Sequence, residues 1–271
     1  MPHEDALALG ENAYVVADGI ARDPIGIKDF TGKSMEELLE SYPKDSGAAL
    51  AAELFCRRFL KELSEHPPYQ KNVQAAFTAS NTAIAKLNRQ RVGVTDYLVN
   101  DYCGCVAAAG MIEDGLLHWG SIGDSGVIIY DNTGQIRWRS PDGMATFAAY
   151  ANKLKYDWNK PEGRKLIRSR FRNNPNMIVD DVCVSYGALT GEDPAKRFMN
   201  FGVEPVERGE MVLFYTDGLK QVVELPEFWQ ILKSGAEPRV KATLLPYLEQ
   251  LAKADYERYG KERTLIAVSA E

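Results

Sequence analysis

The stretch CGCVAAAGMIEDGLLHWGSIGDSGVIIYDNTGQIRWR, residues 103–139, decides the fold. It contains four short apolar runs. Turn signals separate them at Glu113-Asp114-Gly115, Gly123-Asp124 and Asn132-Thr133-Gly134. Short apolar runs between such turns are typical of strands that follow one another through hairpins. We therefore predict an antiparallel meander over residues 103–139.

On each side of this stretch, the predicted helices come as a pair, with predicted strands before, between and after the two pairs. Apolar residues recur at helical spacing over 46–66 and 73–87, and further helices are predicted near 227–233 and 244–259. Strands are predicted at 14–17, 182–186, 211–216 and 264–270, with Asp18-Gly19 as the turn after the first. Helices grouped in pairs, and not alternating with strands, favour an α+β architecture in which helices cover antiparallel sheets. No linker divides the chain, so one domain over 1–271 is expected.

Composition excludes several classes of protein. The chain has 271 residues, of which 45% are hydrophobic, and carries 38 acidic against 32 basic residues, for a net charge of −6. A large core is possible, and the acidic balance argues against nucleic acid as a partner. No apolar run is long enough for a membrane span, and no basic signal segment opens the chain. Four cysteines without a paired spacing fit a reducing compartment, and zinc at Cys103 and Cys105 would need two further ligands. We expect a cytoplasmic protein.

Three apolar strands end in an aspartate beside a glycine, at Asp18, Asp124 and Asp217. Each alone is a common turn signal. Together, carboxylates at neighbouring strand ends can converge on one rim, where cations relieve their repulsion. Oxygen ligands without histidine or thiolate favour Mg²⁺ or Mn²⁺. Two such ions would bind phosphoryl oxygens and lower the pKa of an attacking water, which suits phosphoester hydrolysis.

Five ordered motifs carry a family resemblance that spans almost the whole chain. They are His3-Glu4-Asp5, Asp18-Gly19, Gly104-Cys105-Val106-Ala107, Gly123-Asp124-Ser125 and Thr216-Asp217-Gly218. In this order they resemble the motifs of the PPM, or type 2C, metal-dependent Ser/Thr protein phosphatases. The stretch YGALTGE, residues 186–192, is similar to the segment after the flap in some bacterial members.

The resemblance implies a fold, an activity and a set of ligands. The fold would be a four-layer α-β-β-α sandwich of two antiparallel sheets flanked by paired antiparallel helices, with a variable flap at about 140–200. Asp18 would bridge two Mg²⁺ or Mn²⁺ ions, the Gly19 carbonyl would bind one, and Asp217 the other. Glu4 and Asp5 would act through water, and Asp124 would help hold a weaker third ion. The substrates would be phosphoserine and phosphothreonine proteins, with a cognate Ser/Thr kinase as a further partner and a monomeric enzyme.

The sequence departs from the family pattern in two ways that matter for catalysis. The position of the family's phosphate-gripping arginine falls before Met1, so we expect Arg168 and Arg170, from a basic run over 164–172, and also Arg22 to contact phosphate. Before the last strand, Lys261 stands where the family has a metal-binding aspartate. We expect Glu262 to turn inward as the replacement, with Asp255 as the next choice; otherwise the ion binds weakly and Lys261 points to solvent.

Two alternatives stay open at this point. A phosphatase-like fold without catalysis, acting as a binding or sensing module, would explain the missing arginine and Lys261. A serine protease is suggested by the order of His66, Asp101 and Ser125, because Gly123-Asp124-Ser125-Gly126 matches a protease nucleophile motif. The absence of a secretion signal and of a disulfide framework argues against the protease.

Overall fold

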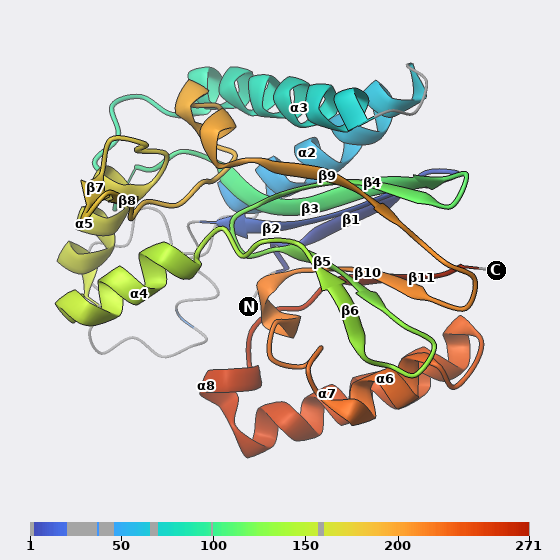
Figure 1. The fold of residues 1–271 in the computed structure, drawn as a ribbon. Helices are drawn as coiled ribbons and strands as arrows, with labels where there is room; N and C mark the ends of the chain where they lie inside the picture. Colours follow the sequence, from blue (N-terminus) through green and yellow to red (C-terminus); the bar gives the residue numbers. More distant parts are fainter. Residues whose placement is uncertain are drawn as a thin grey trace.

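Two antiparallel β-sheets lie face to face, and a layer of helices covers the outer face of each (Figure 1). The computed structural model describes residues 3–20, 37, 46–65, 70–98, 100–156 and 160–270. The predicted fold class, an α+β sandwich of four layers in the order α-β-β-α, is confirmed. Within these ranges, no helix combines the length and the apolar character that a membrane span requires.

The first sheet has five strands in the order β1-β2-β3-β4-β9. They are β1 (Ala6–Leu9), β2 (Ala13–Ile20), β3 (Gly104–Glu113), β4 (Leu116–Ile122) and β9 (Asn200–Pro205). The central strand β3 is rich in alanine and glycine, which lets the neighbouring layers approach it closely. Its first eight residues are buried, as expected for a strand covered on both faces.

The second sheet has four strands in the order β11-β10-β5-β6. They are β5 (Gly126–Tyr130), β6 (Ile136–Arg139), β10 (Met211–Tyr215) and β11 (Leu265–Ser269). Between the two sheets lies an apolar layer that includes Val16, Ala108, Val127 and Phe214. The rings of Trp119 and Trp138 meet at its margin with their centroids 5.0 Å apart.

The prediction of one continuous meander over 103–139 is wrong in one respect. β3 pairs with β4 in the first sheet, and β5 pairs with β6 in the second, so the chain changes sheets at residues 123–125. The two hairpins were visible in the sequence. Which sheet each joins depends on long-range pairing, because β4 pairs with β9 and β5 pairs with β10.

The two predicted N-terminal helices, α2 (Gly47–Ser64) and α3 (Gln70–Arg91), cover the first sheet (Figure 1). The Ser46 hydroxyl accepts hydrogen bonds from the Ala48 and Ala49 amides and so caps α2. Phe55 and Phe77 hold the two helices together, with ring centroids 5.0 Å apart.

Three helices cover the second sheet: α6 (Pro226–Leu232), α7 (Glu237–Ala254) and α8 (Tyr256–Tyr259). The helix predicted over 244–259 begins earlier and is interrupted at Asp255, which ends α7 and caps α8. An apolar cluster that includes Phe228, Trp229, Leu244 and Leu248 packs these helices against β5 and β10.

Four elements between β6 and β9 lie together at one end of the sandwich (Figure 1). They are α4 (Ala145–Leu154), α5 (Pro161–Phe171), β7 (Ile178–Val179) and β8 (Val182–Cys183), whereas the 3₁₀ helix η1 (Asp193–Phe198) packs through Ala195 against the cluster under α2 and α3. This group has its own apolar cluster, in which Phe147, Ile167, Phe171 and Tyr186 pack together. The sequence predicted only one strand here, at 182–186, of which β8 is the beginning.

Candidate active site

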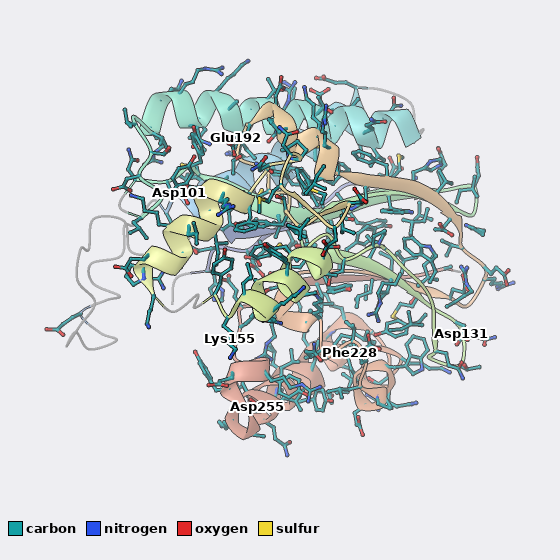
Figure 2. The ribbon with its side chains drawn as sticks, turned by 60° about the vertical axis from the view of Figure 1, so that its left-hand side comes forward. Asp101, Asp131, Lys155, Glu192, Phe228 and Asp255 are labelled. Carbon is teal, nitrogen blue, oxygen red and sulfur yellow. The ribbon has the colours of Figure 1, made fainter. Side chains whose placement is uncertain are left out.

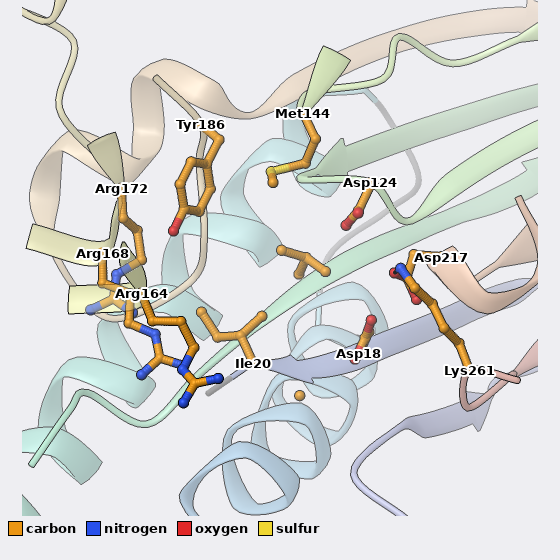
Figure 3. Close-up of a pocket in the computed structure, with 12 residues that line it drawn as sticks. Asp18, Ile20, Asp124, Met144, Arg164, Arg168, Arg172, Tyr186, Asp217 and Lys261 are labelled. Carbon is orange, nitrogen blue, oxygen red and sulfur yellow. Dashed lines mark hydrogen bonds and ion pairs between the residues drawn. The ribbon is translucent and has the colours of Figure 1, made fainter. Parts of the chain in front are cut away.

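A pocket of about 340 Å³ lies where the two sheets meet residues 140–200 (Figure 3). Its walls are formed by Asp18, Gly19, Ile20, Val106, Asp124, Met144, Arg164, Arg168, Arg172, Tyr186, Asp217 and Lys261. The three aspartates singled out in the sequence all line this one pocket. Each comes from a different part of the sandwich, so the pocket exists only in the folded chain.

Asp18 lies within strand β2, and the prediction of a turn at Asp18-Gly19 is wrong. Asp18 pairs with Val106, and the ladder continues to Ile20 opposite Gly104. Gly19 permits this path because the start of α2 passes close by. A Cβ atom at Gly19 would lie 2.7 Å from the Ala48 carbonyl carbon. Asp18 is 8% exposed and lines the pocket from within this strand.

Asp124 and Asp217 flank the paired ends of two neighbouring strands of the second sheet. Asp124 stands at the change of sheets before β5, and Asp217 follows β10, whose last residue Tyr215 pairs with Gly126. Burial raises the pKa of Asp124 to about 6, and the negative charge of Asp217 adds to this shift. The two carboxylates therefore repel each other, and a cation between them would relieve the repulsion.

Lys261 supplies one such cation from the chain itself. Its Nζ lies 2.5 Å from Oδ2 of Asp217, and both residues line the pocket. Partial burial alone would lower the pKa of Lys261, but the charge of Asp217 raises it above its ordinary value. The ammonium group is therefore charged at neutral pH. The expectation that Lys261 points to solvent is wrong.

Glu262 turns away from the pocket, contrary to the favoured prediction. Its carboxylate accepts hydrogen bonds from the backbone amides of Glu4, at 2.9 and 3.1 Å, and Asp5, at 3.0 Å. It also lies 3.1 Å from Nδ1 of His3. Lys261 and Glu262 do face different ways, as expected, but it is Lys261 that faces the aspartates. Glu262 instead fastens the N-terminal segment to the end of the chain.

Asp255 is not brought to the pocket either. It is exposed and accepts a hydrogen bond from the Arg258 amide as the cap of α8, on the outer helical layer (Figure 2). Its short side chain is committed to the helix start, which explains why it does not replace the missing ligand.

Glu4 and Asp5 are engaged by hydroxyl groups and are not among the pocket-lining residues. Ser46 donates to the Glu4 carboxylate, and Thr216 donates to Oδ2 of Asp5 at 2.8 Å. The Thr216 hydroxyl in turn accepts from the Thr264 amide at 2.9 Å. These contacts hold the N-terminal segment against the residue that precedes Asp217.

Three arginines form the wall opposite the aspartates. Arg164, Arg168 and Arg172 follow one another at intervals of four, on one face of α5 and just beyond its end (Figure 3). Arg170 lies on another face, is exposed, and does not line the pocket. Of the two arginines predicted from this run to contact phosphate, Arg168 lines the pocket and Arg170 does not. The four-residue spacing was the signal for Arg164 and Arg172.

Tyr186 completes the arginine wall and was not identified from the sequence. It is 8% exposed, and burial raises its pKa to about 12, so its hydroxyl stays protonated. Its ring packs against Phe147 with centroids 4.9 Å apart. It opens the stretch YGALTGE, but that similarity did not assign it to the pocket, which it reaches through packing with Phe147.

The aspartate wall can bind a hard divalent ion at Asp18 and Asp124, whereas Asp217 is occupied by Lys261. Asp18, the Gly19 carbonyl and Asp124 offer oxygen atoms only, which suits Mg²⁺ or Mn²⁺. Asp217 is already paired with Lys261. Among the described residues, no three His, Cys, Asp or Glu side chains form a compact metal-binding group. The three aspartates share a pocket without closing around a common point.

The serine protease arrangement is not supported by the placement of its candidate residues. Asp101 forms a buried ion pair with Arg172, and Ser125 is 1% exposed and lines no part of the pocket. His66 lies outside the described residues, as does Arg22, the remaining predicted phosphate contact.

Solved structures of bacterial Ser/Thr phosphatases share this fold. The Mycobacterium tuberculosis phosphatase PstP/Ppp aligns with a TM-score of 0.61 at 16% identity, over 100% of this chain and 93% of that one. A PstP catalytic domain in complex with two manganese ions gives 0.60 at 16% identity, over 100% and 93%. The PPM phosphatase MsPP from Mycobacterium smegmatis gives 0.56 at 13% identity, over 100% and 93%.

Comparisons of the sequence alone find no match. No protein-family model matches the chain, and no curated protein matches it. The structural likenesses, all at low identity, show that this chain has the PPM phosphatase fold.

Proposed function

We propose that this protein is a divalent-metal-dependent phosphatase that acts on phosphoserine and phosphothreonine in proteins. The observation that carries the proposal is the two-sided pocket, with aspartates on one wall and arginines on the other. The shared fold with Ser/Thr phosphatases, one of them in complex with two manganese ions, supports the same function. We take residues 1–271 as a single phosphatase domain, with residues 140–200 as its flap.

The arginine wall suits the phosphate group of the substrate. A phosphate dianion is attracted to guanidinium groups, which can donate paired hydrogen bonds to its oxygens. Arg164 and Arg168 line the pocket from α5 and face the aspartates across it (Figure 3). They would hold the phosphoryl group and supply the charge that the family takes from an N-terminal arginine.

The aspartate wall would hold the metal. Asp18, the Gly19 carbonyl and Asp124 are the residues that would bind it. A divalent ion bound there would polarise the phosphoryl group and provide an activated water. Lys261 adds a positive charge beside Asp217, and the buried Tyr186 adds a neutral hydroxyl. Substrate and water would thus meet between two walls of complementary charge.

One observation favours a second function. The ion pair between Lys261 and Asp217 removes a carboxylate from metal binding, which is compatible with a module that binds phosphorylated segments without hydrolysing them. Such a protein would keep the arginine wall and lack turnover. The family expectations of a kinase partner, a monomeric state and a cytoplasmic location belong to the same proposal.

The two functions are separated by assaying the purified protein on an aryl phosphate and on phosphoserine and phosphothreonine peptides. The enzyme predicts hydrolysis that a chelator abolishes and that Mn²⁺ or Mg²⁺ restores. The binding module predicts retention of the phosphopeptide with no phosphate released at any metal concentration. Hydrolysis that is unaffected by the chelator would contradict the metal dependence.

A further inference from the structure

The backbone at Lys261 is held in place by its neighbours along the chain. Arg263 donates to the Lys261 carbonyl at 3.1 Å and to the Leu248 carbonyl at 3.1 Å. Glu262 is anchored to the backbone of Glu4 and Asp5. The backbone of the segment 261–263 is therefore held from two sides, and the direction in which Lys261 leaves it is set by the fold.

Gly218 adds a third restraint on the same segment. A Cβ atom at this position would lie 1.9 Å from the Glu262 carbonyl oxygen, so the 3₁₀ helix η2 (Asp217–Leu219) and the segment 261–263 touch through their backbones. This contact brings Lys261 alongside Asp217. The Asp217 carboxylate is 13% exposed, so the pair is shielded on that side, although the Lys261 side chain is about half exposed.

A divalent ion and this ammonium group compete for the same carboxylate oxygen. Mg²⁺ binds carboxylate oxygens at about 2.1 Å. An ion on Oδ2 of Asp217 would therefore stand within about 5 Å of Nζ, which is 2.5 Å from that oxygen. Two positive centres so close, in a partly buried pocket, repel each other strongly.

The charges in the pocket point the same way. Three carboxylates line it, those of Asp18, Asp124 and Asp217, and the last of them is paired with Lys261. On the aspartate wall alone, one divalent ion together with the ammonium group of Lys261 balances the three carboxylates. A second divalent ion would find Asp217 already neutralised.

We propose that Lys261 is a tethered cation that takes the place of a metal ion at Asp217, so that this protein binds one divalent ion and not two. The inference deepens the proposed function, since it specifies the metal content of the same pocket. It concerns the chain's own Lys261 and can be tested without any substrate.

The test is the number of Mn²⁺ ions bound per chain, measured by equilibrium dialysis and by electron paramagnetic resonance of the bound Mn²⁺. The wild type should bind one ion. Lys261→Met, which removes the charge and keeps most of the length, should bind two, with the spectrum of a spin-coupled pair. Lys261→Arg, which keeps the charge, should remain at one.

Two further variants control for charge and for position. Lys241→Met removes a different cation, one that is paired with Glu237 on α7 and does not line the pocket, and it should leave the number at one. The double variant Lys261→Met with Asp217→Asn should bind one Mn²⁺ ion per chain, against two for Lys261→Met alone. Circular dichroism of each variant shows whether it is folded.

The inference is overturned if the wild type binds two ions, or if wild type and Lys261→Met bind the same number. Failure of the proposed function would be seen in the hydrolysis assay and not in the number of bound ions. A protein that binds one ion, gains a second in Lys261→Met and hydrolyses nothing would refute the phosphatase and retain the role of Lys261. An active enzyme whose wild type binds two ions would support the phosphatase and refute the role of Lys261.

Discussion

The Asp101 carboxylate accepts two hydrogen bonds from the Arg172 guanidinium, at 2.6 and 3.1 Å, and both side chains are 2% exposed. Burial alone would lower the pKa of Arg172, yet the charge and hydrogen bonds of Asp101 raise it above its ordinary value. Arg168 lies on the other side of the same carboxylate, with its Nε 3.6 Å from Oδ2. One buried aspartate thus holds two of the three arginines of the pocket wall.

Loss of this carboxylate charge should destabilise the protein. Asp101→Asn leaves the Arg172 charge buried without compensation, so the free energy of unfolding should fall by about 3–5 kcal/mol in urea titrations. The double variant Asp101→Leu with Arg172→Met removes both charges and should recover most of that loss. A change below about 0.5 kcal/mol in Asp101→Asn would show that the ion pair does not stabilise the fold.

The arginine wall should determine the affinity for phosphorylated substrate. Arg164→Ala removes a charged hydrogen-bond donor from the pocket and should raise KM for a phosphopeptide about tenfold, with a smaller effect at high salt. Arg170→Ala is the matched control, since it removes the same charge from the same helix outside the pocket. Equal KM values for the two variants would show that only the general charge of α5 matters.

The contact at Gly218 should not tolerate a side chain. Gly218→Ala places a Cβ against the Glu262 carbonyl oxygen, so the segment that carries Lys261 must move, at a cost of about 1–3 kcal/mol in unfolding free energy. Gly93→Ala is the control, because a Cβ there has no atom within 4 Å. The proposed close contact is wrong if thermal unfolding shows both variants to be equally stable.

One ion pair remote from the pocket should give the protein a defined acid sensitivity. Hydrogen bonds from Arg137 lower the pKa of Glu210, whose carboxylate lies 2.5 Å from the arginine Nε. A carboxyl group with a lowered pKa in the folded state stabilises the fold above its unfolded pKa of about 4.3 and loses this contribution as pH falls through the folded value.

Glu210→Gln should therefore lower the unfolding free energy by about 1 kcal/mol at pH 7, and the difference from wild type should shrink as the pH falls below about 4. The control is Glu224→Gln, which breaks a more exposed pair with Arg139 on the same strand and should change stability little. A difference for Glu210→Gln that persists unchanged at low pH would contradict the assigned charge interaction.

The fold was largely predictable because its signals are local. Helical periodicity identified α2, and Ser46 marked its start; the two hairpins of residues 103–139 were visible from their turns. The change of sheet between β4 and β5 was not, because it depends on which distant strand each one joins. β1 was also missed, since a four-residue edge strand carries little pattern.

Site residues could be predicted only where a residue and its immediate sequence neighbours form a recognisable motif. Asp18, Asp124 and Asp217 line one pocket, although Asp18 does so from within β2 and not from a strand end. The prediction for Glu262 failed because its partners, the amides of Glu4 and Asp5, lie at the opposite end of the sequence. Tyr186 went unidentified for the same reason, since only tertiary packing brings it to the pocket.

The most direct test of the account is the rate of phosphate release from a phosphoserine peptide by the wild type and by Asp18→Asn, each with and without Mn²⁺. Asp114→Asn is the control, because Asp114 is exposed in the turn after β3, more than about 20 Å along that strand from Val106. Loss of residues that merely support metal ligands costs about 10–100-fold, so loss of Asp18 should cost more than about 100-fold. The account predicts Mn²⁺-dependent release by wild type and Asp114→Asn that Asp18→Asn lacks, and equal release by all three proteins would contradict it.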